Sequence, residues 1–72
     1  MILFERFTQD GVKIAAALPI SGITEVSPNA YQLEHSWIKY HDGITIRSMV
    51  VVGTVDEIVQ RIHNIKQSYM GL

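Results

Sequence analysis

Cysteine is absent from this chain of 72 residues. Neither a disulfide framework nor a thiolate metal site can therefore form, and a reducing cytoplasm is the expected compartment. Charge is also sparse: 18% of the residues are charged, and six Lys and Arg are set against seven Asp and Glu. This balance provides no basic surface for a nucleic-acid backbone.

Long hydrophobic runs are missing as well. The most apolar run covers residues 49–52 and ends at Gly53, which is typical of a buried strand. Glu5 and Arg6 interrupt the apolar N-terminus, so neither a membrane span nor a signal peptide is predicted. We expect a complete, soluble, cytoplasmic protein.

The length permits one domain, residues 1–72, with a thin core. Such a chain buries only about 60% of the surface that its unfolded form exposes. A hydrophobic content of 47% excludes intrinsic disorder, and with no crosslinks the missing burial is expected to come from further copies of the chain. We therefore predict a homo-oligomer. Four apolar residues from the predicted strands are expected to hold it: Tyr31, Leu33, Met49 and Val51.

Turn signals divide the first 52 residues into short strands. Asp10-Gly11 and His41-Asp42-Gly43 are typical of hairpin turns, and Ser27-Pro28-Asn29 of a tighter connection. Pro19 and Gly22 make residues 18–22 a poor ladder segment, so the chain is expected to bend there along a sheet edge. The predicted strands cover residues 2–7, 12–16, 23–26, 31–40 and 44–52.

A helix is predicted after the strands. Thr54 and Glu57 have the T-x-x-E spacing of a capping box, in which each side chain binds the backbone amide of the other residue. Apolar residues then recur with helical spacing over residues 55–67, and Arg61, His63 and Lys66 lie off this stripe. The apolar stripe consists of Val55, Ile58, Val59, Ile62 and Ile65. The predicted fold class is α+β: a small, partly barrel-like antiparallel β-meander of about five strands, residues 2–52, with one C-terminal α-helix, residues 54–67, packed on the sheet.

The last hairpin contains the candidate site. A three-residue loop at residues 41–43 would place Ile38 opposite Ile46 and thus make one face apolar near the tip. The other face would then carry Trp37 beside Arg47 and Lys39 beside Thr45. A two-residue loop separates polar from apolar residues less well. Apolar residues further from the tip change sides, which predicts either a bulge near Ser36 or contact surfaces on both faces.

Trp37 and Arg47 have two interpretations. A guanidinium stacked on an indole could hold an aromatic or anionic ligand, such as a nucleotide, because it still offers hydrogen bonds to phosphate or carboxylate. The same two residue types also dominate protein interfaces, so a subunit contact is the alternative. The predicted ligand- or partner-binding residues are Trp37, Arg47, Lys39, Thr45 and His35.

Catalytic, metal and cofactor sites are not predicted. His35 and His41 are separated by about 20 Å along one strand, which is too far for a shared metal ion. The sequential pair His41-Asp42 has no placed nucleophile, and the glycines occur singly, so no phosphate-binding loop is expected. We therefore expect a protein that is not an enzyme and has no cofactor.

The C-terminal stretch V-V-V-G-T-V-D-E-I-V-Q-R-I, residues 50–62, follows Asp42-Gly43 and the spaced isoleucines Ile20 and Ile23. In this pattern the sequence resembles the small flagellar FlbD/SwrD-type proteins and similar short phage and prophage proteins. The resemblance implies a β-meander, a hairpin at Asp42-Gly43 and a short helix. It assigns no functional residue.

Two functions are expected from these observations. The first is an oligomeric binding module that binds a host protein or sequesters a small anionic ligand. The resemblance to phage and prophage proteins implies that a phage could encode it. The alternative is a flagellar accessory protein of the FlbD/SwrD type. An enzyme ranks lowest, because the sequence has no cluster of histidines and carboxylates from which acid–base chemistry could be built.

Overall fold

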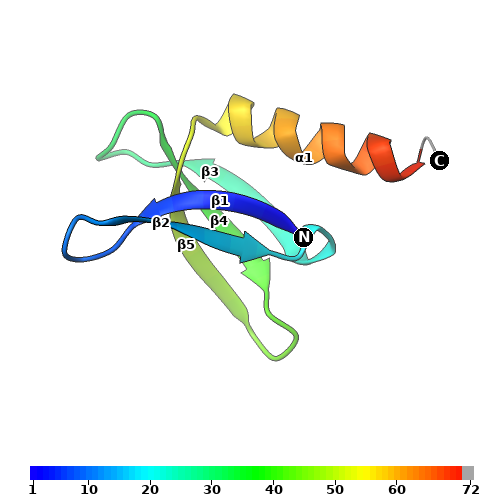
Figure 1. The fold of residues 1–72 in the computed structure, drawn as a ribbon, viewed down its shortest axis with the longest axis horizontal. Coiled ribbons are helices and arrows are strands. Elements are labelled where there is room, and N and C mark those ends of the chain that lie inside the picture. The colour runs from blue at the N-terminus through cyan, green and yellow to red at the C-terminus, as the bar shows by residue number, and fades with distance from the viewer. Residues whose placement is uncertain (71–72) are drawn as a thin grey trace.

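The computed structural model describes residues 1–70. Five antiparallel strands form two separate sheets, and a C-terminal helix packs on them (Figure 1). The elements are β1 (Ile2–Phe7), β2 (Lys13–Leu18), a 3₁₀ turn (Ile20–Gly22), β3 (Ile23–Pro28), β4 (His35–His41), β5 (Ile46–Val52) and α1 (Val55–Met70). The predicted α+β class with a terminal helix is therefore confirmed, but the two sheets do not close into a barrel.

The first sheet is the hairpin of β1 and β2. Its register is regular from the pair Ile2 and Leu18 to the pair Phe7 and Lys13. The turn forms where Asp10-Gly11 predicted it: the Gly11 amide donates to the Thr8 carbonyl, and Gly11 has a φ of 80°. Strand β2 begins one residue later than predicted and continues to Leu18, which lies in the core.

The second sheet has the order β3-β4-β5. Strand β4 begins at His35, so the prediction of a strand over residues 31–40 is wrong in its first four positions. Asn29 Oδ1 accepts a hydrogen bond from the Tyr31 amide, and Glu34 has a φ of 65°, so the chain is not extended there. The predicted bulge near Ser36 is absent, and the irregularity lies between Ile23 and Glu25 of β3 instead.

Helix α1 begins at the predicted cap and is longer than predicted, ending at Met70 rather than Gln67. The Glu57 amide donates to Thr54 Oγ1 over 3.2 Å, whereas the Glu57 carboxylate accepts from the Thr54 hydroxyl rather than from its amide. Of the two hydrogen bonds of a capping box, the one to the Glu57 amide is formed and the one to the Thr54 amide is not. Ile58 is fully buried, but Val59 is 48% exposed and does not belong to the packed stripe.

The core lies between the two sheets and the helix. Strand β1 packs against β5, and α1 packs against β3. The core is small, as the chain length predicted. Its fully buried hydrophobic residues are Ile2, Phe4, Leu18, Ile38, Val51 and Ile58.

The residues predicted to hold an oligomer do not form one surface. Val51 is buried in the protomer core and Met49 packs against it, because the observed register turns both toward β1. Tyr31 and Leu33 are 96% and 92% exposed in the β3–β4 loop. The predicted interface is therefore wrong in its two strand residues. No described helix is long and apolar enough to cross a membrane.

Candidate functional site

The register of the last hairpin differs from the predicted one. Trp37 pairs with Val50, and Arg47 pairs with Tyr40. The observed pairing is displaced by three positions, an odd number, so residues predicted to share a face lie on opposite faces. Trp37 and Arg47 therefore do not stack, and the proposed clamp for a ring and an anion is not formed.

The hairpin tip explains the displacement. The loop covers residues 42–45, because the Asp42 amide donates to the Thr45 carbonyl and His41 pairs with Ile46. The Asp42 carboxylate accepts 2.8 Å hydrogen bonds from the amides of Ile44 and Thr45. It also accepts a hydrogen bond from Arg47 Nε. The tip is thus held by a side chain, and Ile44 is left 91% exposed.

Electrostatics at the tip follow from these bonds. The Thr45 and Ile44 amides, and then the Arg47 guanidinium, hold the pKa of Asp42 well below its usual range. The same ion pair raises the pKa of Arg47. Arg47 and Thr45 therefore act in the hairpin tip, where they organise the loop, and lie apart from Trp37.

The other three predicted residues do lie together. His35, Trp37 and Lys39 alternate along β4 and so share one face of the three-stranded sheet. We call this surface the Trp37 face. It comprises His35, Trp37, Lys39 and His41 of β4, Glu25 and Ser27 of β3, and Ile46, Ser48, Val50 and Val52 of β5.

Trp37 is the centre of this face. It belongs to the middle strand, lies between Ser27 and Val50, and is 43% exposed. Lys39 is 3.2 Å from Glu25 across the strands, so this cation is neutralised by an exposed neighbour. The surroundings of the indole are consequently apolar or neutral. Such a surface offers contact area rather than a charged binding pocket.

His35 forms one end of the Trp37 face. Its Nδ1 lies 3.2 Å from the Leu33 carbonyl, which can only accept, so Nδ1 carries the proton. Nε2 is buried and has no partner among residues 1–70. A ligand cannot reach this nitrogen without moving its neighbours. His35 therefore contributes its ring, which packs against Phe7 with 6.1 Å between ring centroids.

A small cavity adjoins His35. It has a volume of about 220 Å³ and is lined by Phe7, Thr8, Gln32, His35 and Val50. Ligand pockets are typically about 300–1,000 Å³, so this cavity is too small for a nucleotide but sufficient for one inserted side chain. Sequence reasoning missed Val50, which the correct hairpin register would have placed opposite Trp37. It also missed Phe7, which belongs to β1 and reaches His35 only through the packing of the two sheets.

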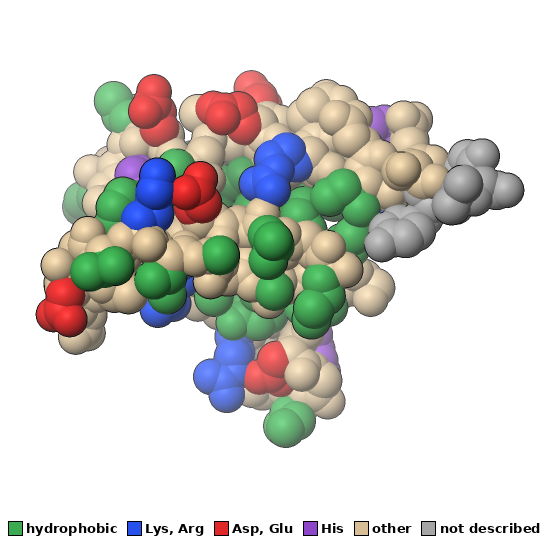
Figure 2. All heavy atoms as spheres, in the orientation of Figure 1, with side chains coloured by type: hydrophobic (Ala, Val, Ile, Leu, Met, Phe, Trp, Pro, Cys, Tyr) green, Lys and Arg blue, Asp and Glu red, His purple; other side chains and the backbone are tan. Residues whose placement is uncertain are grey.

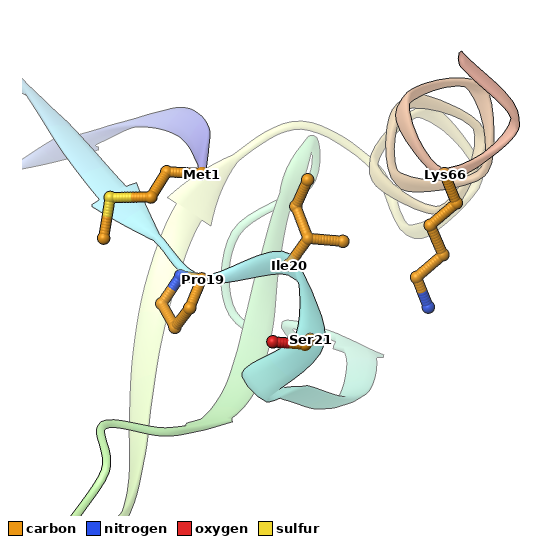
Figure 3. A pocket seen from close by; sticks show the side chains of 5 residues that line it. All are labelled: Met1, Pro19, Ile20, Ser21 and Lys66. Atoms are coloured by element: carbon orange, nitrogen blue, oxygen red, sulfur yellow. The ribbon is translucent and has the colours of Figure 1, made fainter. Parts of the chain in front are cut away.

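A larger pocket than the one beside His35 lies elsewhere. It has a volume of about 500 Å³ and is open to solvent, with Met1, Pro19 and Ile20 on one side and Lys66 of α1 on the other (Figure 3). Lys66 has the only charged side chain among its described lining residues, and Ser21 adds one hydroxyl. None of the predicted site residues borders it.

No group of three or more His, Cys, Asp or Glu residues within residues 1–70 is arranged to hold a metal ion. Comparisons of the chain with protein-family models, with curated proteins and with solved structures found no match.

Proposed function

We propose that this chain is a cytoplasmic, homo-oligomeric binding module without catalytic activity, and that it binds a partner protein through the Trp37 face. The observation that carries the proposal is the exposure of Trp37 at the centre of a sheet face, beside Val50 and a side-chain-sized cavity. Tryptophan is among the residues that contribute most to protein interfaces when it becomes buried at their centre.

A partner protein is favoured over a small anionic ligand. The ligand hypothesis requires Trp37 and Arg47 on one face, and the register separates them. Arg47 is bound to Asp42, and Lys39 is bound to Glu25, so both nearby cations already have anionic partners. A flat, neutral and partly apolar surface fits the core of a protein interface, which is depleted in charge.

The resemblance to FlbD/SwrD-type proteins suggests a more specific form of this proposal, a flagellar accessory protein. It is supported by the presence of a hairpin at Asp42-Gly43 and of a helix that begins V-D-E-I-V. A phage protein that occupies a host protein would use the same kind of surface. The neighbouring genes would distinguish the two settings.

The test is affinity capture from the cells that naturally contain the protein, with three purified baits: wild type, Trp37→Ala and Val59→Ala. Val59 is a matched control, because it is an apolar residue of α1 that is exposed to a similar extent and lies outside the Trp37 face. Retained proteins and small molecules are quantified by mass spectrometry. Circular dichroism verifies that each bait is folded.

We expect a protein that wild type and Val59→Ala retain and that Trp37→Ala retains at least about tenfold less. Equal retention by all three baits would contradict the proposal. Retention of a small anion that depends on Arg47, tested with Arg47→Ala, would restore the ligand hypothesis instead.

A further inference from the structure

Strand β2 has a free edge that differs from the other outer edges of the two sheets. Strand β3 contains a register irregularity, ends in Pro28 and is covered by α1. Strands β1 and β5 pack against each other. Among residues 1–70 no strand or helix is paired with the second edge of β2.

The sequence of β2 carries few of the features that protect an edge. Natural edge strands are usually short, bulged, charged or interrupted by proline, because an open row of backbone amides and carbonyls binds other strands. The β2 sequence, K-I-A-A-A-L, has six residues in regular register without a bulge. Its only charge, Lys13, is at the first position and is 3.2 Å from Glu5 of β1.

The surface around this edge is apolar. Leu3 and Phe7 of β1 and Ile14 of β2 are large hydrophobic residues with substantial exposure, and Ala15 and Ala17 are exposed as well. Figure 2 shows hydrophobic side chains gathered over β1 and β2 on the face that it displays. Small alanine side chains allow another strand to approach without steric hindrance.

The total exposed area is larger than a compact monomer requires. A folded monomer of 8.1 kDa is expected to expose about 4,500 Å². The chain exposes 5264 Å². The excess, about 800 Å², is close to the area that each partner buries in a protein interface of standard size.

We propose that the free edge of β2 pairs antiparallel with β2 of a second copy, so that two hairpins form one four-stranded sheet, β1-β2-β2-β1. A second copy is favoured because the strand is compatible with itself. Antiparallel pairing about a twofold axis places the two Lys13 residues at opposite ends of the pair, whereas parallel pairing would place them side by side.

The pairing determines the number of subunits. Once the two β2 strands are joined, neither retains a free edge, so the contact closes at a dimer and does not propagate. The twofold axis is perpendicular to the sheet. One residue of β2 therefore lies directly opposite its own copy, and the alanines at the centre of the strand are the candidates.

The first test measures the mass of the purified chain by sedimentation over a range of concentrations. Wild type should have twice the mass of 8.1 kDa. The double variant Ala15→Lys/Ala17→Lys places like charges across the pair and should raise the dimer dissociation constant by about tenfold or more. The control His63→Lys/Gln67→Lys adds the same charge to exposed positions of α1 and should remain dimeric.

The second test uses the absence of native cysteine. Single variants Ala15→Cys, Ala16→Cys and Ala17→Cys are oxidised, and the residue nearest the axis should cross-link to its own copy. The control variant His63→Cys, on helix α1, should not cross-link. A wild-type monomer at all concentrations, a dimer unaffected by the β2 lysines, or cross-linking no greater than that of His63→Cys would each overturn the proposal.

This inference rests on the proposed homo-oligomer but not on the proposed partner site. Mass and cross-linking are measured on the purified chain without a partner. Trp37→Ala should therefore leave the mass unchanged, and failure of partner capture would leave the dimer intact.

Discussion

The Ser36 hydroxyl donates a 2.8 Å hydrogen bond to the carbonyl of Gly53. This bond joins the beginning of strand β4 to the connection between β5 and α1. Ser36 is the one fully buried polar residue among those described. Gly53 also donates its amide to the Glu34 carbonyl. The position and direction of the helix therefore depend on the beginning of β4.

Ser36→Ala should lower the free energy of unfolding by about 1–2 kcal/mol, because it leaves the Gly53 carbonyl without its donor. Urea denaturation at one fixed protein concentration measures the change. Ser48→Ala, an exposed serine on β5, is the control and should change the stability by less than about 0.5 kcal/mol. Equal losses of unfolding free energy for the two substitutions would show that the buried hydrogen bond does not stabilise the fold.

Gly53→Ala should be more destabilising than Gly11→Ala. Both glycines have positive φ, 128° and 80°, so alanine is strained at either position by about 1–2 kcal/mol. A Cβ at Gly53 would in addition lie 3.2 Å from Ile58 Cγ1, whereas a Cβ at Gly11 has nothing within 4 Å. Urea denaturation of both variants measures the two losses, and a loss at Gly53 no greater than that at Gly11 would contradict the expectation.

Arg61 should stabilise the helix although it lies off the apolar stripe. Its guanidinium carbon is 4.9 Å from the centroid of the Phe4 ring, and Nη2 donates to the Leu3 carbonyl. Arg61→Ala should cost about 1 kcal/mol in thermal or urea unfolding. Arg61→Lys should recover only part of this, because an ammonium lacks the planar guanidinium. An Arg61→Ala variant with unchanged stability would contradict a stabilising effect of these two contacts.

Asp42 should give the hairpin tip a defined pH dependence. Its pKa is lower in the folded chain than in the unfolded chain, because the Thr45 and Ile44 amides and Arg47 stabilise the carboxylate. Its contribution to stability is therefore complete above the unfolded value of about 3.9 and is lost as the pH falls from there toward the folded value.

The measurement compares wild type with Asp42→Asn at several pH values, so that the other carboxylates contribute equally to both proteins. The difference in unfolding free energy should be constant from pH 7 to about pH 5 and shrink below about pH 4. A difference that increases on acidification would have the wrong sign.

The elements were predictable from local chemistry. The turn at Asp10-Gly11, the capping residue Thr54 and the α+β class follow from short-range preferences, which act in the same way in the folded chain. Helix packing at Ile58, Ile62 and Ile65 follows from their spacing, although Val59 has the same spacing and stays exposed. Spacing places a residue on a helix face but does not tell how far the sheet extends beneath it.

The candidate site was only partly predictable, because it depends on hairpin register. Segregation of Ile44 and Ile46 onto the core side favoured the three-residue loop, but the core lies at the other end of the hairpin, at Ile38 and Val51. The carboxylate of Asp42 instead determines a four-residue loop through its bonds to the loop amides. The sequence did contain one signal for this loop, namely an acidic and a basic residue, Asp42 and Arg47, five positions apart across the turn.

The loop over residues 29–34 shows a similar limit. Tyr31 and Leu33 have side chains typical of strands, yet both are exposed in a loop. Asn29 binds the Tyr31 amide, and Glu34 adopts a left-handed conformation. Intrinsic strand preference at two positions is weaker than side-chain capping before them and a backbone reversal after them.

The location of Ile58 in the core also has a consequence for the order of folding during synthesis. Ile2 and Phe4 leave the ribosome well before Ile58, which shares the core with them. Until α1 has emerged, the nascent strands have no helix to cover their apolar side. The meander should therefore remain susceptible to protease until the helix has emerged from the ribosome, and become resistant abruptly after that point.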